Sequence, residues 1–120
     1  MANTEANRLL EERTLAFAVA LVRLVGGLPR TDVASVVGRQ LLKSGTSIGA
    51  NYRETNRAES REDFVQKSAI VLKECAETEY RLELCTRTEL GVVAEREALL
   101  QEARELLAIF TTINRRAKGR

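Results

Sequence analysis

The chain has no histidine, no tryptophan and a single proline in 120 residues. Without histidine a Ser-His-Asp triad cannot form, and the most common general base and metal ligand is absent. Aromatic residues make up 4% of the chain, which argues against a module that stacks many exposed bases. There is no Asn-Gly or Asp-Gly hairpin turn and no long alternating run, so no strand is predicted. These absences favour a helical protein without catalytic activity.

Only two cysteines are present, Cys75 and Cys85. If they share a helix, ten residues at about 1.5 Å each separate them by roughly 15 Å, which is too far for a disulfide. Two cysteines without histidine also make a poor metal site. We therefore expect buried thiols in a reducing cytoplasm, with no metal and no cofactor.

No segment predicts export or membrane insertion. The N-terminus begins polar and lacks the charged-then-apolar pattern of a signal peptide. The longest apolar run, residues 15–22, is much shorter than a membrane span. We expect a soluble cytoplasmic protein that has no membrane partner and no small-molecule substrate.

Small residues are densest between residues 40 and 54. In a helix, Gly45 and Gly49 lie one turn apart on one side, where another backbone can approach closely. Residues 45–49 also match G-x-S-x-G, the nucleophile elbow of serine hydrolases, but that motif needs a preceding strand and a histidine. The Walker phosphate loop, G-x-x-x-x-G-K-[ST], does not match. Close helix packing is the better interpretation.

The helix boundaries carry clear local signals. Gly26-Gly27 and Pro29 end the first helix, and Thr31 or Asp32 caps the second. Ser60 caps the third helix, and Gly91 provides a left-handed cap at its end. The sequence therefore predicts an all-α fold, an antiparallel up-down-up-down four-helix bundle, as a single domain over residues 1–120. The predicted helices span about residues 4–25, 32–55, 61–87 and 94–116.

Two of these helices have more apolar surface than one core face requires. Residues 15–22 are apolar nearly all round, which indicates burial on more than one side. The third helix has a core face and a second, mixed face that includes Lys73, and we expect this second face to contact another subunit or another part of the bundle. Glu79 lies close to the core face and needs a polar partner, which the second helix could supply through Gln40, Asn51 or a basic side chain. The predicted subunit interface consists of Ala69, Ile70, Ala76, Tyr80 and Leu84.

The excess of positive charge is confined to two places. Residues 30–61 contain six basic and three acidic residues, and residues 92–120 contain six and four. In a continuous second helix, four basic side chains form a stripe that is either a phosphate-binding surface or a solvated face. The basic tail, residues 115–120, is either a nucleic-acid contact or a favourable charge at a helix C-terminus. The candidate RNA-binding residues are Arg39, Lys43, Arg53, Arg57, Arg115, Arg116 and Lys118.

Three segments also carry a family resemblance: residues 41–54 (LLKSGTSIGANYRE), 70–80 (IVLKECAETEY) and 105–113 (ELLAIFTTI), with Arg57, Ser60, Asp63 and Phe64 between the first two. Over about residues 10–118 the chain resembles the bacterial 23S rRNA intervening-sequence proteins, some of which are encoded within insertions in 23S rRNA genes. The resemblance implies a four-helix bundle that assembles as a ring-like homo-oligomer, commonly a pentamer. It implies no enzymatic activity.

Two functions from different classes follow. The first is a non-catalytic homo-oligomer that binds structured RNA through the basic residues, because ring assembly repeats weak phosphate contacts and increases avidity. The alternative is a protein-interaction scaffold whose charges serve solubility. Asn51 and Glu79 fit equally well as polar members of the bundle core.

Overall fold

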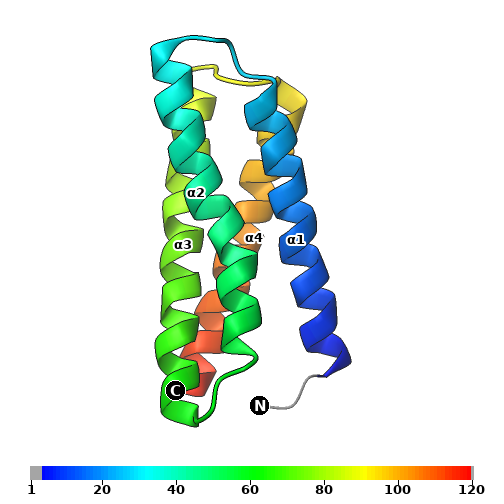
Figure 1. The fold of residues 1–120 in the computed structure, drawn as a ribbon, viewed down its shortest axis with the longest axis vertical. Coiled ribbons are helices and arrows are strands. Elements are labelled where there is room, and N and C mark those ends of the chain that lie inside the picture. Colours follow the sequence, from blue (N-terminus) through cyan, green and yellow to red (C-terminus); the bar gives the residue numbers. More distant parts are fainter. Residues whose placement is uncertain (1–3, 120) are drawn as a thin grey trace.

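The computed structural model describes residues 4–119, and over this range the chain forms four α-helices and no strand (Figure 1). The helices alternate in direction, as expected for an up-down-up-down bundle, and the all-α prediction is confirmed. Each observed boundary lies within one residue of the expected position. The helices are α1 (Glu5–Gly26), α2 (Asp32–Thr55), α3 (Arg61–Arg87) and α4 (Val93–Ala117).

Local capping explains where the helices begin. The Thr31 hydroxyl accepts a hydrogen bond from the Ala34 amide at 3.1 Å, and the Ser60 hydroxyl accepts one from the Asp63 amide at 3.0 Å. Each bond satisfies a first-turn N–H that has no partner within its helix. Val92, at the start of α4, makes no such side-chain bond.

The cap of α3 differs from the prediction, although the helix ends at Arg87 as expected. Gly91 has a positive φ of 94°, but Thr88 is the C-cap and Glu89, at φ 56°, is the left-handed residue that follows it. The amide of Leu90 donates to the Cys85 carbonyl at 2.8 Å, the bond of a Schellman motif. Because this motif places its left-handed residue directly after the C-cap, Glu89 adopts that conformation and Gly91 serves the following turn.

The four helices lie at the corners of a square. In the described part of the chain, α3 packs against α2 and α4, and α1 packs against α2 and more sparsely against α4. Within residues 4–119, no Cα atom of α1 lies within 8 Å of a Cα atom of α3 and none of α2 lies within 8 Å of one of α4, so each of these pairs is diagonal. The outer sides of α1 and α3 therefore face away from each other across a molecule that measures 45 × 23 × 21 Å.

The interior is mostly aliphatic, as the shortage of aromatic residues predicts. Tyr52 and Phe110 make an edge-to-face contact with ring centroids 5.1 Å apart. Gly45 and Gly49 line the α1–α2 contact: a Cβ at residue 45 would overlap Leu21, and one at residue 49 would lie 3.0 Å from the Thr14 hydroxyl. The predicted close helix approach is thus observed. Fully buried members include Leu21, Leu41, Ile48, Val71, Leu82, Leu106 and Phe110.

Glu79 has a partner, but on a different helix from the one expected. Its carboxylate lies 3.4 Å from the Nε of Arg104, which is on α4. The prediction that α2 supplies the partner was therefore wrong. Spacing along one helix gives the side on which a residue lies, but it does not identify the neighbouring helix that faces it.

Candidate nucleic-acid interface

The α2–α3 connection and the end of α4 meet at one end of the bundle (Figure 1). The Nε of Arg61 donates to the Ala117 carbonyl at 2.9 Å. One turn deeper, the side-chain amide of the buried Asn114 donates to the Ser68 hydroxyl at 2.9 Å. These bonds fix the last turns of α4 against the first turns of α3.

This junction brings basic side chains from three places in the sequence into one region. Arg57 lies in the connection after α2, Arg61 begins α3, and the remaining cations come from the last turn and C-cap of α4. All of them are exposed. We call this set the basic end, and it comprises Arg57, Arg61, Arg115, Arg116 and Lys118.

The cations of the basic end are weakly paired. Arg57 is 4.0 Å from Glu54, and its side chain is 77% exposed. Within residues 4–119, no carboxylate lies within 4.0 Å of Arg115, Arg116 or Lys118. Their charges are therefore available to an external anion such as a phosphate. Arg120, the last residue of the predicted basic tail, lies outside the described residues.

One carboxylate at the same end, that of Asp63, is partly neutralised. Asp63 accepts the Glu59 amide at 3.2 Å and lies 3.1 Å from the Nζ of Lys67. The backbone hydrogen bond, followed by the bond to Lys67, lowers the pKa of Asp63 below its usual value. Its negative charge is thus engaged in the start of α3.

The predicted stripe on α2 is not one surface with the basic end. At about 1.5 Å per residue, Arg39 and Lys43 lie roughly 27 and 21 Å along the helix axis from Arg57. Both are exposed on the outer side of α2. Arg53, near the end of α2, is 4.0 Å from Glu11 of α1. The structure thus brings Arg57 together with the tail and leaves Arg39 and Lys43 apart.

Arg61 belongs to the basic end but was missed from the sequence. Its position beside Arg57 was a signal, yet its carbonyl partner is 56 residues away and no local pattern reveals it. The residues proposed as a subunit interface are all exposed on α3 in the single chain, and their role remains a prediction: Ala69, Ile70, Ala76, Tyr80 and Leu84.

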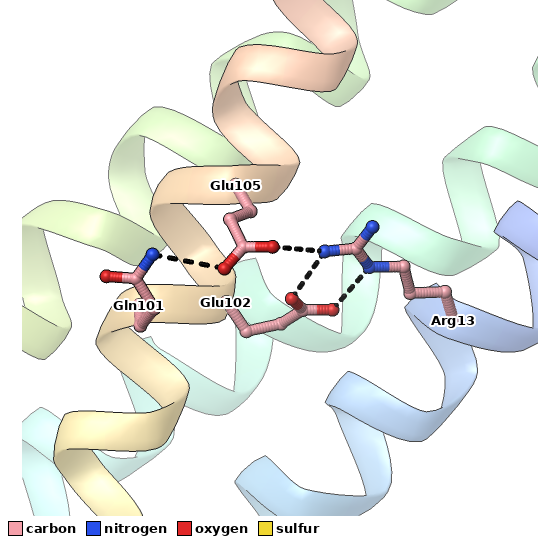
Figure 2. Close-up of polar contacts among 4 residues, drawn as sticks. All are labelled: Arg13, Gln101, Glu102 and Glu105. Atoms are coloured by element: carbon pink, nitrogen blue, oxygen red, sulfur yellow. Dashed lines mark hydrogen bonds and ion pairs between the residues drawn. The ribbon is translucent and has the colours of Figure 1, made fainter.

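A second polar cluster joins α1 to α4 and was not predicted. Figure 2 shows Arg13 reaching across to Glu102, with both guanidinium–carboxylate hydrogen bonds at 2.7 Å. The same guanidinium donates to Glu105 at 2.9 Å, and Gln101 donates to the other oxygen of Glu105 at 3.0 Å. The bond to Glu102 raises the pKa of Arg13, and the bonds from Gln101 and Arg13 lower the pKa of Glu105.

This arrangement favours the ionised form of Glu105, because it lowers the pKa of that carboxyl. A general acid needs a carboxyl whose pKa is raised toward neutrality. Glu105 is shifted in the opposite direction, and Glu102 is bound on both oxygens by Arg13. The cluster therefore joins α1 to α4 through side-chain hydrogen bonds, where the two helices pack sparsely.

The cysteines are buried and free, as expected. Burial raises the pKa of the Cys75 thiol to about 12 and raises the pKa of Cys85 as well. The thiolate is the reactive form, so neither side chain is an activated nucleophile. Among the described residues, no helix is long and apolar enough to cross a membrane, and no three potential ligand side chains gather into a metal site.

Fold and surface together define an all-helical bundle with a basic end. The chain belongs to the 23S rRNA-intervening sequence protein family, whose model matches residues 10–112. It is also similar to a solved structure from Bacteroides thetaiotaomicron, described as a protein of unknown function from the S23 ribosomal protein family. That similarity has 39% sequence identity and a TM-score of 0.81, over 91% of this chain and 97% of the other. No curated protein matches the chain.

Proposed function

We propose that this chain is a non-catalytic homo-oligomer, assembled as a ring, that binds structured RNA through its basic end. The supporting observation is the gathering of Arg57, Arg61 and the α4 tail at the junction fixed by the Arg61–Ala117 bond. Cations without nearby carboxylates gain most from phosphate, since they release counterions from the nucleic acid without losing an internal ion pair.

Assembly makes such a small basic surface effective. Three to five phosphate contacts per subunit give weak binding at physiological salt. Subunits that present the same end on one side of a ring offer several such surfaces to one RNA, so later contacts are intramolecular. The scarcity of aromatic residues favours contacts to the phosphate backbone over base stacking, and hence weak sequence preference.

The test compares two triple variants that remove the same charge. Arg115→Gln/Arg116→Gln/Lys118→Gln removes cations from the basic end. The control removes three exposed cations at or near the opposite end: Arg23→Gln/Arg30→Gln/Arg87→Gln.

Both variants would be titrated with a structured rRNA fragment at several salt concentrations. The first should bind every RNA more weakly, with the salt slope reduced by about 0.7–0.9 for each phosphate that the variant no longer neutralises. The control should stay close to the wild-type slope. Equal losses of affinity in both variants would show that only net charge matters, and an unchanged affinity in the first would remove the basic end from the proposal.

A protein-interaction scaffold is the second candidate, and one surface feature favours it. A groove of about 500 Å³ lies between α1 and α4, where packing is sparse, and its lining includes Ala16, Ala20 and Ala98. Small apolar side chains leave room there for side chains of a partner. A defined protein that stays bound after nuclease treatment, and is released by Ala20→Glu, would favour the scaffold.

A further inference from the structure

The outer side of α1 carries an exposed apolar face. Leu15, Val19 and Val22 are 45%, 42% and 52% exposed in the single chain, although each is a large aliphatic side chain. Together with Ala18 and with Ala50 of α2 they line a shallow hollow of about 380 Å³. We call Leu15, Val19 and Val22 the α1 face.

A second exposed face lies on α3, and its side chains are mostly apolar although Lys73 lies within it. Ile70, Tyr80 and Leu84 are 48%, 67% and 38% exposed, and the exposed Ala69 and Ala76 lie among them. Tyrosine is enriched at protein interfaces because its ring is apolar and its hydroxyl tolerates water. We call Ile70, Tyr80 and Leu84 the α3 face.

The other two helices lack a comparable face along their length. The described large exposed apolar residues of α2 and α4, Val33, Val36 and Val93, lie near the helix starts. Further along, α4 presents exposed residues such as Gln101, Arg104 and Thr111. The bundle thus has two apolar sides, and they belong to helices that lie diagonally across it.

The placement of the two apolar faces on opposite sides of the bundle determines which symmetry of contact between copies can cover both. A two-fold dimer built on one face would leave the other face in water, because an isologous contact uses the same surface twice. A contact between the α1 face of one copy and the α3 face of the next covers both. Repetition of that heterologous contact closes into a ring when the rotation per step permits it.

The two faces are also at matching heights. α1 and α3 run in the same direction (Figure 1). At about 1.5 Å per residue, the α1 face begins roughly 15 Å from the start of its helix and the α3 face roughly 14 Å from the start of its own. Two bundles placed side by side in the same orientation therefore bring the faces together and leave the basic ends on one side.

We propose that the α1 face of one copy docks on the α3 face of a second copy of this chain, and that this is the contact that builds the ring. The inference rests on the homo-oligomer in the proposed function, and it names the surfaces that join.

Site-directed cross-linking tests the pairing. Both native cysteines are fully buried, so a short bis-maleimide reacts only with introduced thiols. Val19 and Ala76 lie about 21 and 22 Å from the starts of their helices, so they should be adjacent across the contact. The variants are the double Val19→Cys/Ala76→Cys, the two single variants, and a control pair Val19→Cys/Ala108→Cys that uses the outer side of α4.

The double variant should give a ladder of cross-linked multimers, and the single variants and the control pair should remain single chains. Within such a ring, equivalent thiols lie about a bundle width apart, and the bundle measures 23 × 21 Å across. Dimers from either single variant would show a two-fold contact and overturn the inference. Wild-type oligomers without a ladder from the double variant would also overturn it, while leaving the homo-oligomer intact.

Mass measurements separate this inference from the proposed function. Val19→Glu and Tyr80→Glu should each convert the wild-type assembly to folded chains of about 13.4 kDa with unchanged helix content, because both side chains are exposed in the single chain. Variants that keep the wild-type mass would overturn the proposed faces. A wild-type protein of 13.4 kDa would overturn the homo-oligomer itself, whatever its RNA binding.

Discussion

Replacing Gly45 by alanine tests the close approach of α1 and α2. A methyl group at this position would overlap the Cδ2 of Leu21, which is fully buried and cannot move aside without disturbing its neighbours. Overpacking of this kind costs about 1–3 kcal/mol, and alanine regains about 1 kcal/mol over glycine in a helix interior. The net effect should be a loss of about 0–2 kcal/mol in the free energy of unfolding.

A matched variant controls for helix propensity. Gly26 is the last residue of α1, and a Cβ there would have no atom within 4 Å. Gly26→Ala should be neutral or stabilising by up to about 1 kcal/mol. The two variants should therefore differ by about 0–3 kcal/mol in the free energy of unfolding, in favour of Gly26→Ala.

A double-mutant cycle assigns the cost to one pair of side chains. Leu21→Ala alone should cost about 2–5 kcal/mol through loss of buried volume. In that background the alanine at residue 45 has room, so the cycle should give a coupling of about 1–3 kcal/mol. Urea unfolding at a fixed protein concentration measures each free energy. A coupling below about 0.5 kcal/mol would refute the packing argument.

Three further predictions concern buried and capping groups. The thiols of Cys75 and Cys85, both buried, should not react with a thiol reagent in the native protein and should react fully after denaturation; rapid native labelling would contradict their placement. Folding lowers the pKa of Asp63 from 3.8, so the ionised carboxylate stabilises the protein above that pH and this stabilisation is lost as the pH falls through the folded pKa. The difference in free energy of unfolding between wild type and Asp63→Asn should therefore be constant above about pH 5 and shrink below 3.8. A difference that does not change with pH would contradict the capping role. Asn114→Ala leaves the buried hydroxyl of Ser68 without its donor, and we expect a loss of about 1–3 kcal/mol in urea unfolding, whereas a neutral result would show that water replaces the amide.

The helix limits were predictable because their causes are local. Gly26-Gly27 with Pro29, and the hydroxyls of Thr31 and Ser60, act within a few residues of the boundaries that they set. The residue that caps α3 was the exception. Glu89 takes the left-handed conformation expected of Gly91. The hydrogen bonds of the final turn require that conformation directly after the C-cap, even though glycine would adopt it at a lower conformational cost than glutamate.

Contacts between distant residues could not be read from the sequence. The Arg13–Glu102 pair spans 89 residues, and Glu79 takes its partner from α4 because α3 packs against both neighbours. Helical periodicity defines a face but not the helix opposite it. For the same reason, the apolar run in α1 indicated a second buried side, but only the arrangement of the bundle shows that this side is outward and opposite the α3 face.

The candidate site was predicted in part for related reasons. The tail and Arg57 were chosen for charge alone, and the fold places them together because the chain returns to the same end after two helices. The continuous stripe from Arg39 to Arg57 assumed one uninterrupted surface along α2. The helix ends at Thr55, so Arg57 belongs to the connection that follows it.

Titration of the wild-type protein with a structured rRNA fragment is the most direct test of RNA binding by the basic end. The protein should be freed of nucleic acid by nuclease treatment, its assembly mass checked, and the affinity measured at low and physiological salt. We expect saturable binding. The logarithm of the association constant should fall linearly with the logarithm of the salt concentration, with a slope that reflects several phosphate contacts. No binding even at low salt would contradict the account, and the cations of the basic end would then serve only to solvate the protein.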